Sequence, residues 1–285
     1  MTRSAGLRTL QPADLPDLTT LLDQDPVVNV VVASRVRAVG LDPATLGARV
    51  VGWYDGDGRL VAACYLGPNI IPIGLDPVAW PEAVEAIAGQ ARRTGRFASS
   101  LVGPADAVLA LWARLERYWG RARQVRADQP LMAIDHLSPI PPDPSVRLVR
   151  PDEVDILLPA SVAMFTEEVG VSPVGYDGGS FYRARVAELV ESRCALARIE
   201  DGRVVFKAEI GAATPAACQV QGVWVDPGLR NRGLATSGMA TVVRYALERV
   251  APVVSLYVNA YNAPALAVYA KVGFTQVARF ATVLL

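Results

Sequence analysis

The chain contains an internal repeat, so its two halves are expected to fold on one plan. Residues 7–18 align with residues 146–157, with an arginine, a proline and the final leucine at the same places in both. Further matches follow in the same order: Asp57-Gly58 with Asp201-Gly202, Asp76-Pro77 with Asp226-Pro227, and residues 108–112 with residues 265–269. The offset grows from 139 residues (146 − 7) to 157 residues (265 − 108), as duplication followed by loop insertions would produce.

Each half reads as a mixed α+β lobe. It begins with a strand and a helix start containing Pro and Asp, continues with a hairpin around Asp-Gly, and ends with alternating strands and helices. We assign residues 1–136 to the first lobe, residues 137–145 to a linker and residues 146–285 to the second lobe. The linker is rich in proline, which favours extended backbone, so we expect a semi-rigid spacer.

The second lobe contains a strand, a basic glycine loop and a helix start in succession. Val220 to Val225 is rich in β-branched residues, Asp226-Pro227-Gly228 ends the strand, and a helix is expected from Thr236 or Ser237 to Glu248. Unpaired N–H groups and the helix dipole make such a helix start suitable for binding phosphate. A Walker loop is excluded because Leu234 and Ala235 replace its Lys and Ser/Thr, and no dinucleotide fingerprint fits.

Two motifs resemble those of the GNAT N-acetyltransferases. Arg230 to Ala235 reads R-x-x-G-x-A, similar to the family's pyrophosphate loop, and Asn262 to Phe274 reads N-x-x-A-x-x-x-Y-x-x-x-G-F, similar to a later family motif. The resemblance covers residues 146–285. It implies two tandem GNAT-fold lobes, each a mostly antiparallel central sheet flanked by helices. It also implies an N-acyltransferase that moves an acetyl group from acetyl-CoA directly to a primary amine of a small molecule or protein.

The resemblance also implies which residues hold acetyl-CoA. In the family, the strand that contains Val223 to Val225 splays from its parallel neighbour, and its free backbone groups would bond the pantetheine arm. The loop from Arg230 to Thr236 would bind the pyrophosphate. Asn262 and the helix that follows it would flank the arm, with Lys271 near the nucleotide phosphates. The expected cofactor-binding residues are Val223, Trp224, Val225, Arg230, Asn231, Arg232, Gly233, Leu234, Ala235, Thr236, Asn262, Ala265, Tyr269 and Lys271.

Tyr269 and Glu209 are the catalytic candidates. Tyr269 stands at the position of the family's tyrosine and would protonate the leaving thiolate, since a tyrosine with its ordinary pKa of about 10 is protonated at neutral pH. Glu209 is the candidate base, acting directly or through water. Lys207 lies two residues away on the same strand face, so an ion pair between Lys207 and Glu209 is the alternative interpretation.

A glycine-containing segment after the lobe's first helix is expected to face the acceptor. Glu167 and Glu168 precede it and either attract a cationic amine or form a solvated helix end. Its glycines suggest a mobile loop. The other candidates for lining the cleft are Tyr176, Asp177, Phe181, Tyr182, Tyr257, Asn259 and Tyr261.

The first lobe lacks these features. After Asp76-Pro77 it has neither arginine nor glycine, and Glu82 lies near the place where a phosphate would bind. Trp112 occupies the position of Tyr269, and Ala105 that of Asn262. We therefore expect a degenerate GNAT-like lobe that packs on the second lobe or covers the substrate cleft.

Charge and the spacing of cysteine and histidine bear on the expected partners and metal sites. The chain has 28 basic and 28 acidic residues, so no nucleic-acid or anionic-membrane partner is expected. Cys64, Cys194 and Cys218 lie far apart and His136 is the single histidine, so no metal is expected. We expect a cytoplasmic protein, monomeric or homodimeric. Two alternatives stay open: a non-catalytic acyl-CoA-binding sensor or interaction protein, and a small-molecule acetyltransferase like mycothiol synthase.

Overall fold

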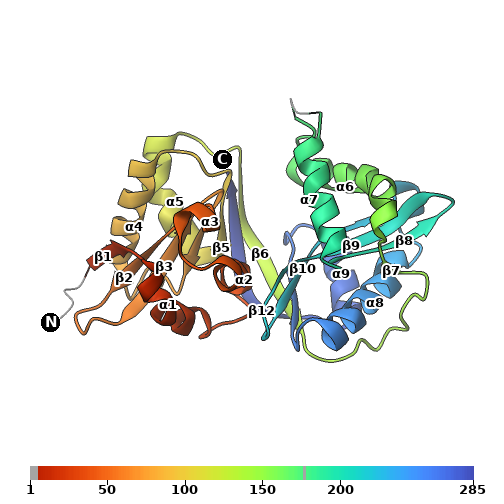
Figure 1. The fold of residues 1–285 in the computed structure, drawn as a ribbon, viewed down its shortest axis with the longest axis horizontal. Coiled ribbons are helices and arrows are strands. Elements are labelled where there is room, and N and C mark those ends of the chain that lie inside the picture. Colours follow the sequence, from red (N-terminus) through yellow and green to blue (C-terminus); the bar gives the residue numbers. More distant parts are fainter. Residues whose placement is uncertain (1–5, 176–177) are drawn as a thin grey trace. The chain divides into compact units, whose positions relative to one another are not determined.

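The computed structural model describes residues 6–175 and 178–285, which form two compact units. The first unit contains the described residues of 1–132, 257–261 and 276–285, and the second contains those of 133–256 and 262–275 (Figure 1). Among the described residues, no helix is long and apolar enough to cross a membrane.

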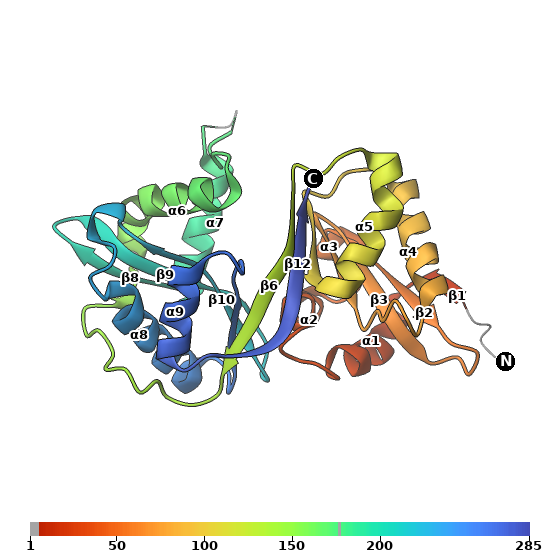
Figure 2. The same cartoon turned by 180° about the vertical axis from the view of Figure 1, so that it is seen from behind.

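The first unit has a mixed sheet with helices on both faces. Its strands run in the order β1 (Gly6–Thr9), β2 (Arg49–Tyr54), β3 (Leu60–Leu66), β4 (Asn69–Ile73), β5 (Ser100–Pro104), β12 (Thr275–Leu284) and β6 (Gln124–Ile134). Its helices are η1 (Pro12–Asp14), α1 (Leu15–Leu22), α2 (Val30–Val39), α3 (Pro43–Leu46), α4 (Pro81–Thr94) and α5 (Ala105–Trp119). One apolar core lies beneath α4 and α5, and a second beneath α1 to α3 (Figure 2).

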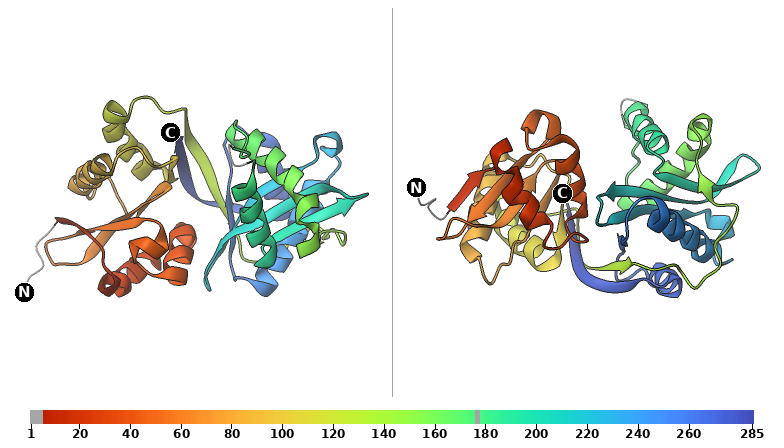
Figure 3. Two further views of the ribbon diagram at one scale, coloured as in Figure 1. Left: turned by 45° about the horizontal axis from the view of Figure 1, so that its top comes forward. Right: turned by 60° about the horizontal axis from the view of Figure 1, so that its bottom comes forward.

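The second unit follows the same plan. Its strands run in the order β11 (Val254–Tyr257), β10 (Cys218–Val225), β9 (Arg203–Ala213), β8 (Ala195–Glu200) and β7 (Arg147–Leu148). Its helices are η2 (Pro151–Glu153), α6 (Val154–Val169), α7 (Ser180–Glu191), η3 (Pro227–Leu229), α8 (Leu234–Arg249) and α9 (Ala263–Val272). Helices α6 and α7 cover one face of this sheet (Figure 3), and α8 packs on the opposite face. The fold class is mixed α+β, as predicted.

Within the described residues, most strand pairs of each unit are antiparallel, and the predicted hairpins are confirmed. Strand β2 pairs with β3 on either side of residues 55–59, and β8 pairs with β9 around Asp201-Gly202. Asp201 and Gly202 both have positive φ values, 48° and 72°, as a two-residue hairpin turn of type I′ requires. Strands β4 and β5 pair in parallel, as do β10 and β11.

The first repeated segment builds the same ion pair in both units. Arg8 donates to both carboxylate oxygens of Asp14 at 3.1 and 2.8 Å, and the Gln11 N–H donates to the same carboxylate at 2.8 Å. Arg147 contacts Glu153 in the same bidentate way at 2.7 Å, and the Arg150 N–H donates to it at 2.9 Å. In each unit the acid therefore ties the first strand to the start of the first helix.

The compact units do not coincide with the sequence repeats. Strand β12, the last element of the second repeat, pairs antiparallel with β5 of the first unit from Phe280↔Pro104 to Leu284↔Ser100. The buried Gln129 amide of β6 accepts from Thr282 Oγ1 at 2.6 Å and donates to Asn259 Oδ1 at 2.9 Å. The lobe boundaries 1–136 and 146–285 stay a prediction about where the repeats begin and end.

The proline-rich linker is anchored within the second unit. Asp143 is buried and accepts from Arg198 of β8 at 2.8 Å. Its backbone carbonyl accepts from Thr241 Oγ1 of α8 at 2.9 Å, and its N–H donates to the Ser237 carbonyl at 3.1 Å. These bonds fix the segment that precedes the second repeat.

We predict that Glu153→Gln lowers the free energy of unfolding by about 2 kcal/mol at pH 7, because a buried carboxylate that accepts from two arginine nitrogens and a backbone N–H is replaced by a neutral amide. The hydrogen bonds from Arg147, and then the Arg150 N–H and the two guanidinium charges, lower the pKa of Glu153 from 4.5 to about 2. This stabilisation is therefore complete above about pH 4.5 and disappears as the pH falls towards 2. Urea unfolding at pH 7 and pH 3 measures both values, with Asp14→Asn as the matched variant. An equal loss at both pH values would contradict the electrostatic explanation.

Candidate functional site

Strand β10 contains a bulge at Gly222 and Val223. Gln221 lies opposite Glu209 of β9, but Trp224 lies opposite Lys207, so two residues of β10 face a single residue, Ala208. Gly222 has φ +61°, a left-handed conformation that glycine adopts without strain. A bulge of this kind bends the strand and increases its twist, and so changes the direction of the residues that follow.

The parallel ladder between β10 and β11 is short. It contains the pairs Cys218↔Val254 and Gln219↔Ser255. Val223, Trp224 and Val225 lie beyond it, and within the described part of the chain the β11 edge of these three residues has no ladder partner. Apart from the Val225 carbonyl, which accepts from Arg230 Nε at 3.2 Å, these three residues have no ladder bond on that edge within the described residues, so they can pair with an extended ligand.

The loop after β10 is held by its own backbone and by one acid. Asp226 Oδ1 accepts from the Gly228 N–H at 2.8 Å, and the Leu229 N–H donates to the Asp226 carbonyl at 2.8 Å. Asn231 and Gly233 follow with positive φ values of 62° and 84°. The chain thus makes a compact turn before α8.

Helix α8 begins at Leu234, with Gly233 as its N-cap, so the predicted start at Thr236 or Ser237 was wrong. The Thr236 and Ser237 N–H groups both donate to the Gly233 carbonyl, at 3.0 and 3.2 Å, and therefore already lie in the first turn. The left-handed glycine, rather than a hydroxyl side chain, makes the transition into the helix.

The start of α8 presents unpaired donors. Within the described residues, the N–H groups of Gly233, Leu234 and Ala235 have no acceptor. They lie at the N-terminal end of the 16-residue helix α8, whose dipole adds partial positive charge there. Arg232 is exposed beside them. This arrangement suits a phosphate group.

Arg230 has a different set of contacts. It forms a bidentate ion pair with Glu167 at 2.8 and 2.7 Å, and its Nε donates to the Val225 carbonyl at 3.2 Å. The hydrogen bond and charge of Arg230, and then the Trp224 indole, lower the pKa of Glu167 against the opposing effect of burial. The structure therefore brings together the loop arginine and Glu167, for which attraction of a cationic amine and a solvated helix end were the two expectations.

The later motif forms helix α9. Asn262 caps it, since its Oδ1 accepts from the Ala265 N–H at 3.2 Å, and Lys271 is exposed in the last turn. Tyr269 is 7% exposed and lies edge-on to Phe274 at 5.9 Å between ring centroids. Burial, and then the charge of Glu168, raises the pKa of Tyr269. The phenol therefore keeps its proton at neutral pH.

Glu209 and Lys207 form a buried ion pair on the face of the sheet that α6 and α7 cover. The Tyr182 hydroxyl donates to the Ser161 carbonyl at 3.0 Å, and its pKa is raised to about 12 by burial and then by the nearby charge of Glu209. Of the other candidates on this side, Phe181 is 83% exposed. Tyr176 and Asp177 lie outside the described residues.

Sequence reasoning missed the bulge and the contact between Lys207 and the Gly222 carbonyl at 3.2 Å. The available signal was Gly222 itself, a glycine inside a run of β-branched and aromatic residues, which often indicates a bulge. Lys207 was recognised as a neighbour of Glu209, but its bond to the strand opposite depends on the register.

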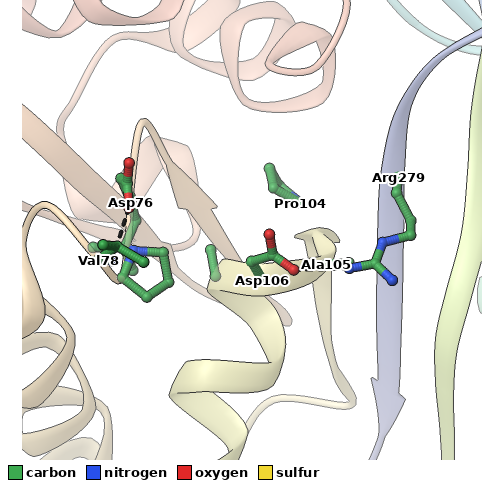
Figure 4. Close-up of a pocket in the computed structure, with 9 residues that line it drawn as sticks. Asp76, Val78, Pro104, Ala105, Asp106 and Arg279 are labelled. Atoms are coloured by element: carbon green, nitrogen blue, oxygen red, sulfur yellow. Dashed lines mark hydrogen bonds and ion pairs between the residues drawn. The ribbon is translucent and has the colours of Figure 1, made fainter.

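The first unit has a pocket at the position that the repeat equates with this site. It has a volume of about 480 Å³ and lies between the turn after β4 and the start of α5 (Figure 4). Asp76 Oδ1 accepts from the Val78 and Ala79 N–H groups at 2.8 and 3.0 Å. Asp106 pairs with Arg279 of β12 at 2.9 Å. The Val78 and Ala79 N–H groups of this turn are thus already bonded to Asp76, and Arg279, which lines the pocket, is already paired with Asp106.

No group of three or more His, Cys, Asp or Glu residues in the described part of the chain could hold a metal ion.

Comparison with known protein families finds one match in each half of the chain. Residues 162–274 match the model of the acetyltransferase (GNAT) family, and residues 48–157 match a domain of unknown function, DUF4081. A search of curated proteins finds no match.

Solved structures resemble the chain over nearly its whole length, which confirms the tandem GNAT-like fold. A tandem GNAT protein from the clavulanic acid biosynthesis pathway aligns with a TM-score of 0.56 and 16% identity, covering 99% of this chain and 98% of that one. A GCN5-related N-acetyltransferase from Sphaerobacter thermophilus aligns with a TM-score of 0.61 and 19% identity, covering 98% and 94%. A Drosophila protein aligns with a TM-score of 0.66 and 14% identity, covering 98% of each.

Proposed function

We propose that the chain, of which residues 162–274 match the acetyltransferase (GNAT) family, uses acetyl-CoA to acetylate a primary amine of a small molecule or a protein. We also propose that residues 146–285 contain the whole catalytic site, and that residues 1–136 are a lobe that has lost it. The observation that carries the proposal is the continuous unit of bulged strand, compact loop and helix start from Gly222 to Ala235.

The residues of this unit fit the chemical groups of coenzyme A. The N–H groups of Gly233, Leu234 and Ala235 suit the pyrophosphate, and the exposed side chain of Arg232 adds positive charge. The pantetheine amides would bond the open edge of Val223 to Val225 as an added strand. Asn262 caps the start of α9 by accepting from the Ala265 N–H. Lys271, exposed on the same helix, supplies a positive charge in addition to that of Arg232.

Acetyl-CoA supplies the acetyl group as a thioester. Transfer forms a C–N bond and breaks the C–S bond, while the amine loses a proton and the sulfur gains one. Tyr269 is the proposed proton donor to the sulfur, because burial keeps its phenol protonated and because α9, by resemblance to the family, would flank the pantetheine arm. A strand N–H near Val225 would polarise the thioester carbonyl.

A binding protein without catalysis would share the same loop. The difference lies in Tyr269, a buried phenol that a sensor does not need, whereas an acetyltransferase uses its proton. Release of free thiol from acetyl-CoA in the presence of a panel of amines and peptides separates the two. Binding of coenzyme A with no release for any amine would favour the sensor.

We predict that Gly233→Asp weakens coenzyme A binding at least tenfold, because a carboxylate is placed against the pyrophosphate. Gly233→Asn is the matched control, since Asn and Asp both tolerate the left-handed φ of +84° and differ in charge. A Cβ at this position meets no atom within 4 Å, so neither variant is excluded by packing. Isothermal titration measures both affinities. Equal affinities for the Asp and Asn variants would show that the phosphates do not lie here.

We predict that Tyr269→Phe lowers kcat ten- to a hundredfold and leaves the Kd of coenzyme A within about threefold, because the variant loses only the proton donor. Trp112→Phe, the change at the aligned position of the first repeat, should leave kcat unchanged. The thiol-release assay measures kcat, and titration measures Kd. An unaltered kcat for Tyr269→Phe would remove Tyr269 as the acid.

A further inference from the structure

The bulge in β10 lies against a buried charge pair that the proposed chemistry leaves unexplained. Lys207 has no exposed surface and Glu209 is 5% exposed, and their ammonium and carboxylate groups are in direct contact. The same ammonium donates to the Gly222 carbonyl at 3.2 Å. Burying two charges is unfavourable unless their geometry and hydrogen bonds compensate, so a pair placed at a bulge calls for a specific explanation.

The contact is tight enough to define the bulge. A Cβ added to Gly222 would lie 3.1 Å from the carboxyl group of Glu209 and 3.2 Å from Lys207 Nζ. Gly222 is therefore required twice, for its left-handed φ and for the space that the pair occupies. The Lys207 ammonium also binds the Gly222 carbonyl, which the bulge turns out of the ladder and which would otherwise be a half-buried acceptor without this bond.

The pair is also enclosed on the side where an acceptor amine would approach. Tyr182 of α7 lies near Glu209, and its hydroxyl donates a hydrogen bond to the Ser161 carbonyl of α6 at 3.0 Å. Tyr182 packs edge-on against Phe165 at 5.6 Å between ring centroids. A base that removes a proton from an amine must come within hydrogen-bond distance of it or of one bridging water, which this enclosure opposes.

We propose that Lys207 is a positioning residue for acetyl transfer: its ammonium joins the Gly222 carbonyl to the Glu209 carboxylate and so fixes the direction of Val223 to Val225. This inference rests on the proposed function, because that strand segment is where the thioester would be bound. It assigns Glu209 to the same hydrogen-bonded pair, as the counterion of Lys207, rather than to proton abstraction.

Two variants test the proposal. Lys207→Met/Glu209→Met removes both charges at similar volume, which avoids an unpaired buried ion but leaves the Gly222 carbonyl without its donor. Glu209→Gln keeps Lys207 and an acceptor for it, but removes any basic carboxylate.

For the double Met variant, we expect kcat to fall at least tenfold while the Kd of coenzyme A stays within threefold, since the phosphate-binding N–H groups belong to the loop and α8. For Glu209→Gln, we expect kcat within fivefold of the wild type and the same pH profile. A double Met variant that folds and keeps kcat within twofold would overturn the proposal. So would a loss above a hundredfold in Glu209→Gln together with loss of the acidic limb of the pH profile, because that result identifies a base. If the double variant does not fold, Glu209→Gln decides alone.

Amide hydrogen exchange provides a measurement that does not depend on activity. In the double Met variant, exchange in a peptide covering residues 219–226 should accelerate at least tenfold, while a peptide covering β8 stays unchanged. Unchanged exchange in residues 219–226 would overturn the role of Lys207 even if the wild-type protein transferred no acetyl group. Faster exchange with no wild-type turnover would instead contradict the proposed function alone.

Discussion

The organisation of the second unit depends on one register constraint: two residues of β10 lie opposite a single residue of β9. Such an insertion cannot be absorbed in a regular ladder, so the strand bends and one carbonyl leaves the sheet. The chain that follows must then leave its parallel neighbour β11, enter a compact loop and begin a long helix. The open strand edge and the unpaired helix donors are both consequences of this departure from the sheet. They lie close together because few residues separate Gly222 from Leu234.

The two repeats show which parts of this plan are structural and which are specialised. Both units keep the acid that ties the first strand to the first helix, the Asp-Gly hairpin and the Asp-Pro turn. After the turn they differ. Asp76 occupies two N–H groups of its own turn, and α4 begins with Pro81, which has no N–H. Asp226 binds a single N–H of its turn, and α8 begins after a glycine with its donors unpaired. The fold forms with either kind of turn, so the sequence of the loop after Asp226 reflects binding rather than a requirement for stability.

Local features of the sequence predicted local structure well. The Asp-Gly turns, the strand before Asp226 and the helix containing Tyr269 follow from propensity and spacing, and the order of the repeats followed from alignment. The helix start was misplaced by two residues because a hydroxyl cap was expected where a left-handed glycine is used. The pairing of Arg230 with Glu167, the buried contact of Lys207 with Gly222 and the position of β12 depend on residues far apart in sequence. Neither propensity nor motif spacing contains that information.

The position of β12 has a consequence for how the protein is made. The first compact unit includes residues 276–285, and β5 has its antiparallel partner in that strand. During translation, these residues are synthesised only after the main segment of the second unit, residues 133–256. Until β12 has been made, the first unit cannot complete its sheet, and its β5 edge and the apolar residues that contact Ala281 and Val283 stay uncovered. The unit whose first strands are made earliest is thus completed after most of the second unit has been synthesised.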